Sequence, residues 1–164
     1  MEFCYTSQAD KRRRYPVETI PAILAAAQRG ARDLDQRRAL VAWMHANNAT
    51  TAEALHDAAR AGIYRQSDRD ECDPIQEVSE TIAHGGDCDQ WAAVIMAGLR
   101  VLGFARVYLV TAGDEADPYR HAAVEFFAGG KMWLSDPKAD QTGHPFNTRA
   151  DMPHYPRRQH WRLA

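Results

Sequence analysis

A change of periodicity near Gly103 constrains the fold more than any other feature of the sequence. Before Gly103, apolar residues recur every three or four positions, and they predict helices over residues 20–31, 34–47, 52–61 and 91–102. After it, β-branched and aromatic residues predict strands over 106–111, 121–127 and 131–135, with a tight turn at Gly129-Gly130 between the last two. Helices followed by a small antiparallel sheet predict an α+β fold.

The length of 164 residues is that of a single domain, which we expect to span residues 1–164. Three parts follow from the patterning: a helical N-terminal part (1–62), a core that carries the candidate site (63–137) and an irregular C-terminal extension (138–164). Residues 63–86 have little periodicity and predict a long loop. A loop of this length in a compact domain is usually functional or covers a site.

The charge balance excludes some partners. Lys and Arg number 20 against 22 Asp and Glu, a net charge of −2, which argues against nucleic-acid binding. No apolar stretch reaches the roughly 18 residues of a membrane span, and the N-terminus has no secretory pattern. The basic run 11–14 is interpreted as a solvated arm, with a phosphate or partner contact as the alternative.

The cysteine count is small and odd. Three cysteines predict no disulfide framework and favour a reducing compartment. Cys4 and Cys72 are expected to be bystanders. These inferences predict a cytoplasmic location.

The third cysteine, Cys88, follows two glycines at the start of a predicted helix. The positive end of the helix dipole and its unbonded N–H groups are expected to stabilise a thiolate there. The same N–H groups can serve as an oxyanion hole. A small buried apolar role is the alternative for an isolated cysteine.

A histidine and an aspartate complete a candidate triad. His121 opens one predicted strand, and Asp136 follows the strand that returns after the Gly129-Gly130 turn. The two ends of such a hairpin lie side by side, so the side chains of His121 and Asp136 should be neighbours. With the Cys88 helix packed on this sheet, cysteine would attack, imidazole would carry the proton and carboxylate would orient the imidazole.

The stretch from about residue 75 to 137 resembles the transglutaminase-like superfamily of the papain-like fold. The resemblance is carried by Gly86-Asp87-Cys88-Asp89, by Leu102-Gly103, by the strand led by His121 and by Trp133-Leu134-Ser135-Asp136-Pro137. It is strongest to the small transglutaminase-like cysteine peptidase domains of bacteriophages and prophages. The resemblance implies that Cys88 is the nucleophile, His121 the general base and Asp136 the orienting acid. It also implies that Gln90 and Ala123, where the family commonly has acidic and aromatic residues, line a substrate groove.

Four further residues are candidates for oxyanion or substrate contacts: Gln76, Asp87, Asp89 and Trp133. Gln76 lies upstream of the nucleophile, as a papain-type oxyanion glutamine does, although an ordinary loop role is the alternative; the backbone N–H of Cys88 is the other donor. Asp87 is well placed as a helix N-cap. Trp133, like Trp43 and Trp91, is expected to anchor the core and could also shield the triad.

No cofactor and no metal are predicted. Cys72 and Cys88 lack the spacing of zinc ligands. The acidic stretch 68–73 lacks the glycine and the regular spacing of a calcium loop. The tail histidines His144, His154 and His160 are expected to be solvated or to pack.

Two functions are consistent with these features. The first is an enzyme that transfers or hydrolyses an acyl group of a peptide, protein or glutamine amide through a thioester on Cys88, with water as the favoured acceptor. The second is a structural or interaction protein of a phage particle that keeps the fold as a scaffold. On the phage interpretation, the partners include other phage structural proteins, and the location is the host cytoplasm or the virion.

Overall fold

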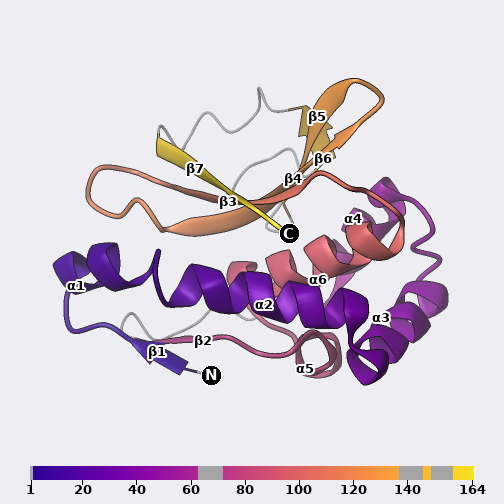
Figure 1. Cartoon of the computed structure of the whole chain (residues 1–164), viewed down its shortest axis with the longest axis horizontal. Helices are drawn as coiled ribbons and strands as arrows, with labels where there is room; N and C mark the ends of the chain where they lie inside the picture. The colour runs from indigo at the N-terminus through magenta and orange to yellow at the C-terminus, as the bar shows by residue number, and fades with distance from the viewer. Residues whose placement is uncertain (1, 63–71, 137–145, 149–156) are drawn as a thin grey trace.

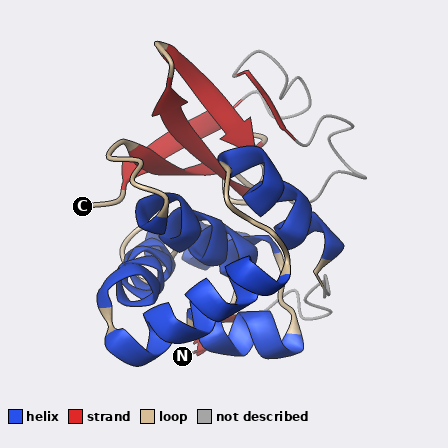
Figure 2. Cartoon of the chain, turned by 90° about the vertical axis from the view of Figure 1, so that its right-hand side faces the viewer, coloured by secondary structure: helices blue, strands red, loops and turns tan. Residues whose placement is uncertain are grey.

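Helices and a sheet form two layers in the computed structural model, which describes residues 2–62, 72–136, 146–148 and 157–164. The helices lie against one face of the sheet (Figure 2). They are α1 (Gln8–Arg14), α2 (Thr19–Arg32), α3 (Leu34–Ala46), α4 (Ala52–Ala61), α5 (Val78–His84) and α6 (Cys88–Val101). The predicted α+β fold is confirmed, and α2, α3, α4 and α6 begin and end within a few residues of the predicted helices.

The sheet is antiparallel and has five strands in the order β6-β5-β4-β3-β7 (Figure 1). Its strands are β3 (Val107–Gly113), β4 (His121–Ala128), β5 (Lys131–Ser135), β6 (Phe146–Thr148) and β7 (Arg157–Arg162). The hairpin between β4 and β5 turns at Gly129 and Gly130, both of which have positive φ. The three predicted strands are therefore confirmed as β3, β4 and β5.

Helix α6 lies at the centre of the fold, between α2 and the sheet (Figure 1). Residues 89–99 are all buried, so this helix is covered on every side. That is the environment expected for a helix without a polar face. Trp91, Ile95 and Leu99 are each about 1% exposed, and Trp43 of α3 packs on Trp91 with ring centroids 6.0 Å apart, as predicted for core anchors. No helix in the described part of the chain has the length and apolar character of a membrane span.

The C-terminal extension was predicted to be irregular throughout. The structure differs, because β7 forms an edge of the sheet. This strand pairs with β3 from Tyr108↔Arg162 to Gly113↔Arg157. Its sequence, RRQHWR, carries no alternation of apolar and polar residues, so the sequence did not predict a strand here. Two anchors hold it: Trp161 donates its indole N–H to Thr111 Oγ1 at 3.2 Å, and Leu163 is 1% exposed.

The segment predicted as a long loop also contains regular structure. Strand β2 (Cys72–Pro74) pairs with β1 (Glu2–Cys4), and α5 follows it. A reciprocal capping box between Glu77 and Glu80 begins α5. Because this helix has seven residues, its apolar pattern was too short to detect. Residues 63–71 of the predicted loop lie outside the described residues.

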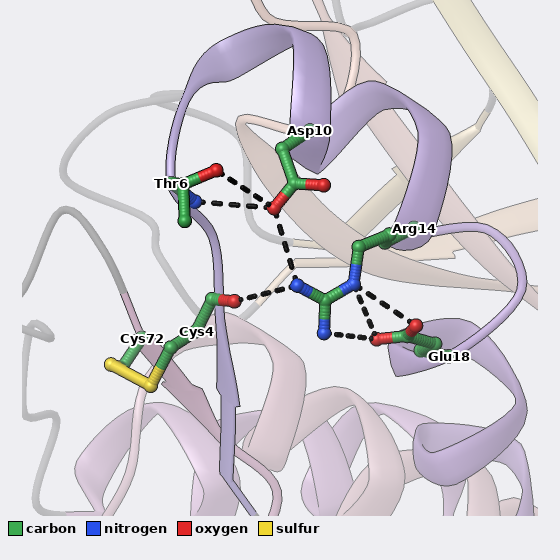
Figure 3. Close-up of a disulfide and its surroundings, with 6 residues drawn as sticks. All are labelled: Cys4, Thr6, Asp10, Arg14, Glu18 and Cys72. Carbon is green, nitrogen blue, oxygen red and sulfur yellow. Dashed lines mark hydrogen bonds and ion pairs between the residues drawn. A yellow bond between two sulfur atoms is a disulfide. The ribbon is translucent and has the colours of Figure 1, made fainter.

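The basic run belongs to α1 and is not a free arm, because three of its four side chains bind other parts of the chain, while Arg13 is exposed. Lys11 Nζ lies 3.2 Å from Asp117 Oδ2, and Arg12 donates to the carbonyls of Glu115 and Ala116. Arg14 donates to the Cys4 carbonyl and to two carboxylates, those of Asp10 and Glu18 (Figure 3). Helix α1 is thus fastened both to β1 and to the loop that leads into β4.

A disulfide joins Cys4 to Cys72, contrary to the expectation that both are bystanders (Figure 3). The two cysteines face each other in the register of β1 and β2, 68 residues apart in sequence. Neither strand was predicted, so the sequence alone did not bring these cysteines together. The number of cysteines consequently gives no support for a reducing compartment.

Candidate active site

Cys88 is the first residue of α6, and a capping box holds the helix start in place. Asp87 is the N-cap, as predicted, and its carboxylate accepts from the backbone N–H of Asp89 at 3.2 Å. In return, Gln90 Oε1 accepts from the backbone N–H of Asp87 at 2.7 Å. Gln90 is 3% exposed and Ala123 is 0% exposed, so the expectation that both line a substrate groove is wrong.

Two glycines bring the chain from α5 into α6. Gly85 ends α5 with φ of 78°, a conformation that favours glycine. A Cβ on Gly86 would lie 2.3 Å from Gln90 Oε1, so a side chain there would displace the capping box. The two glycines therefore permit the tight connection between α5 and α6 that places Cys88 in the first turn of α6.

His121 and Asp136 are hydrogen-bonded, as the hairpin argument predicts. His121 Nε2 lies 2.8 Å from Asp136 Oδ2, and both residues are buried. The last paired positions of β4 and β5 are Val124 and Ser135, so Asp136 follows the paired region directly. A carboxylate that accepts at Nε2 fixes the proton there, which makes Nδ1 the basic nitrogen of the ring.

Cys88 lies beside the strand that carries this histidine. The backbone N–H of Ala122, the residue after His121, lowers the pKa of the Cys88 thiol, and the Asp136 charge raises it. The N-terminus of α6 and the beginning of β4 thus meet at one place, with Cys88, His121 and Asp136 around it.

The electrostatics of Cys88 differ from the sequence expectation. Burial raises the pKa of the Cys88 thiol well above its ordinary value, and the carboxylates of Asp89 and Asp87 raise it further. The Ala122 N–H lowers the pKa but does not outweigh these effects. The resting form is therefore the thiol, and the helix terminus alone does not produce a thiolate. Forming the thiolate at neutral pH would therefore require a base that takes the proton of the Cys88 thiol.

Asp89 has a defined structural role beside Cys88. Tyr15 donates its hydroxyl to Asp89 Oδ2 at 2.7 Å, and the Cys88 thiol points to Asp89 Oδ1 at 3.7 Å. Burial and the nearby Asp87 charge raise the pKa of Asp89 to about 6, against lowering by the Tyr15 hydroxyl. Tyr15 follows α1 and stacks on Tyr119 with centroids 4.8 Å apart. No local signal in the sequence marks Tyr15 as part of the site.

A second buried histidine lies next to Asp136 and was missed by sequence reasoning. His56 of α4 is 0% exposed, and its Nδ1 lies 2.8 Å from Ser135 Oγ, one residue before Asp136. Burial lowers the pKa of His56, so the ring is neutral at pH 7. This contact fastens the end of β5 to the helical layer.

Two candidates for oxyanion or substrate contacts remain, Gln76 and Trp133. Gln76 lies between β2 and α5, and its buried Oε1 has no hydrogen-bond partner within the described parts of the chain. Trp133 of β5 packs on the core and donates its indole N–H to the Ala128 carbonyl at 3.2 Å. Their roles in oxyanion or substrate binding stay predictions.

The structure describes only part of the segments that concern metals and the tail histidines. The described residues contain no group of three or more His, Cys, Asp or Glu that could hold a metal. Most of the acidic stretch 68–73 lies outside them, as do His144 and His154. His160 lies on β7, with Nε2 3.0 Å from Oε2 of the buried Glu125.

Comparisons with known proteins identify structural neighbours only. No protein-family model matches the chain, and no curated protein matches it. Among solved structures, calcium-bound LapG from Legionella pneumophila matches with a TM-score of 0.57 and 16% identity, covering 80% of each chain. EGTA-treated LapG matches with a TM-score of 0.55 and 16% identity, covering 83% of this chain and 77% of that one.

A further LapG structure from the same organism covers 87% of this chain and 82% of that one, with a TM-score of 0.55 and 16% identity. These likenesses define a class of fold: the chain has the α+β, papain-like fold of the LapG structures. LapG shares this fold across most of both chains.

Proposed function

We propose that this protein is a transglutaminase-like cysteine peptidase or amidase that uses Cys88, His121 and Asp136. The observation that supports it most is the buried His121–Asp136 hydrogen bond next to a cysteine at a helix N-terminus. LapG, which has this fold, is a transglutaminase-like cysteine protease. A fold by itself does not establish an activity, so the proposal depends on these residues.

The first half of the reaction forms a thioester. His121 Nδ1 takes the proton of the Cys88 thiol as the sulfur attacks the carbonyl carbon of the scissile amide. Asp136 stabilises the imidazolium through the Nε2–H hydrogen bond. When the tetrahedral intermediate collapses, the C–N bond breaks, and the imidazolium gives its proton to the leaving amine.

The second half releases the acyl group. A water molecule attacks the thioester carbonyl, His121 takes its proton, and the C–S bond breaks to give a carboxylic acid and the free thiol. An amine in place of water would give a crosslink. The backbone N–H of Cys88, together with the side-chain amide of Gln76, would donate to the oxyanion. We favour water as the acceptor, since a hydrolase needs no second binding site.

An assay with three readouts tests this proposal and its product class. Wild-type protein and Cys88→Ala are incubated with casein and with a glutamine-donor peptide, in the presence and absence of a fluorescent primary amine. Mass spectrometry then detects peptide cleavage, deamidation and amine incorporation. We expect cleavage or deamidation that requires Cys88. Amine incorporation as the main Cys88-dependent product would contradict the hydrolase assignment, and products equal in Cys88→Ala would contradict the role of the cysteine.

Calcium is an experimental variable in these assays, because one LapG structure is calcium-bound and another is EGTA-treated. The described residues offer no cluster of three ligands, and no step above depends on a metal. Each reaction is therefore run with calcium and with EGTA. Phage origin and virion association stay predictions, which the genes beside this one would test.

A further inference from the structure

A cavity of about 340 Å³ lies at the end of α6 remote from Cys88. The last turns of α2 and α6, the beginning of α3 and residues 163–164 form its wall. Three guanidinium groups line it, from Arg32, Arg37 and Arg100, and the described lining residues include no Asp or Glu. This concentration of positive charge is unexpected in a chain whose net charge is −2.

The three guanidinium groups are held by backbone carbonyls. Arg37 Nη1 donates to the Ala31 carbonyl at 3.1 Å, and Arg100 Nη1 donates to the Ala105 carbonyl at 3.0 Å. Arg32 Nη2 lies 3.5 Å from the Ala164 carbonyl. Each guanidinium has five N–H donors in a fixed fork, so these contacts orient the group and use only part of its capacity.

None of the three arginines forms an ion pair with an Asp or Glu side chain among the described residues. Other arginines of this chain do: Arg29 binds Glu77, and Arg14 binds Glu18.

All three guanidinium groups lie at helix C-termini. Arg32 and Arg100 are in the last turns of α2 and α6, where a cation interacts favourably with the helix dipole. Arg37 is the fourth residue of α3, and its guanidinium reaches the last turn of α2 through the Ala31 carbonyl. An anion between the three groups would accept from the N–H donors that these carbonyls leave free.

We propose that this cavity binds the phosphate or carboxylate group of a small anionic ligand. Arginine forks match the oxygen geometry of both groups and bind them through charge-assisted hydrogen bonds. The volume of about 340 Å³ falls in the range of small-molecule sites, and Phe104 supplies an apolar wall for the rest of the ligand. The site is separate from the Cys88 centre and does not depend on the function proposed for it.

Isothermal titration of the full-length protein at constant ionic strength tests this proposal. The probes are inorganic phosphate, pyrophosphate and citrate, with sodium chloride as the ionic-strength control. The variants are Arg37→Gln and Arg100→Gln, and the matched control is Arg38→Gln, which changes an exposed neighbour that lies outside the cavity and pairs with Asp35. Melting curves establish that each variant is folded.

We expect saturable binding of at least one of the three probes to wild-type protein and to Arg38→Gln. Affinity should fall roughly tenfold or more in Arg37→Gln and in Arg100→Gln, the loss expected for one charge-assisted hydrogen bond. Tighter binding of pyrophosphate would assign the site to phosphate groups, and tighter binding of citrate to carboxylates. Lack of saturable binding to folded wild-type protein, or equal affinity in Arg37→Gln and Arg38→Gln, would overturn the proposal.

Discussion

Individual side chains around Cys88 hold the thiol in its protonated form. The nearest acidic groups, Asp89 and Asp87, oppose ionisation of the thiol, and burial adds to their effect. The positive end of α6 favours the thiolate but is outweighed. Under the proposed function, catalysis at this cysteine would therefore depend on proton transfer to His121 rather than on a preformed thiolate.

Asp89 makes stability depend on pH. Its pKa is about 6 in the folded protein against 3.8 as the ordinary value, so the folded state binds more protons between these values and stability falls as the pH rises through them. We expect Asp89→Asn to raise the free energy of unfolding at pH 8 by about 1–3 kcal/mol, an effect that shrinks toward pH 4. Urea unfolding in EGTA at both pH values measures this.

Tyr15→Phe provides the opposite change at the same contact. Loss of the hydroxyl raises the pKa of Asp89 further, so this variant should be less stable than wild type, and more so at pH 8 than at pH 5. The double variant with Asp89→Asn should lose this dependence on pH. An Asp89→Asn protein that is less stable than wild type at pH 8 would contradict the assignment.

At the scale of elements, the disulfide connects the N-terminal segment to the strand that precedes α5. Cys4–Cys72 closes a loop of 68 residues, for which the chain-entropy treatment gives about 4 kcal/mol of stabilisation. We expect Cys4→Ser/Cys72→Ser to unfold at lower urea concentration by about that free energy. Dithiothreitol should destabilise wild type and leave the double variant unchanged. Equal stability of the two proteins without reductant would contradict the structural role.

Residues after β7 should contribute to the core although the sequence predicted an irregular tail. Leu163→Ala removes a side chain that is 1% exposed, and we expect a loss of about 2–5 kcal/mol in the free energy of unfolding. Leu34→Ala is the matched control, since Leu34 is 61% exposed and its loss should change stability by less than about 0.5 kcal/mol. Similar losses for both leucines would contradict the position of the C-terminal segment.

At the scale of the molecule, the elements with strong periodicity were predictable and the short ones were not. The apolar spacing of α6 and the Gly129-Gly130 turn were sufficient to place Cys88 at a helix start and to make His121 a neighbour of Asp136. Strands β1, β2 and β7 depend on backbone pairing across long sequence separations, so their local patterns did not reveal them.

The electrostatic environment of the site was also beyond local sequence reasoning. The sign of the Cys88 pKa shift is set first by burial, which depends on how other elements pack around the start of α6, and the adjacent Asp89 and Asp87 add to it. The roles of Tyr15 and His56 likewise arise from elements far away in the sequence. Neither residue type nor spacing along the chain contains this information.

The central claim is that His121 activates Cys88, and the rate at which iodoacetamide labels Cys88 as a function of pH tests it most directly. Cys4 and Cys72 are joined, so Cys88 is the free thiol of the folded protein. We expect wild-type protein and the exposed-site control His45→Ala to be labelled at pH 7 at least about tenfold faster than His121→Ala, since the imidazole takes the thiol proton. Identical pH–rate profiles for wild type and a folded His121→Ala protein would contradict the account.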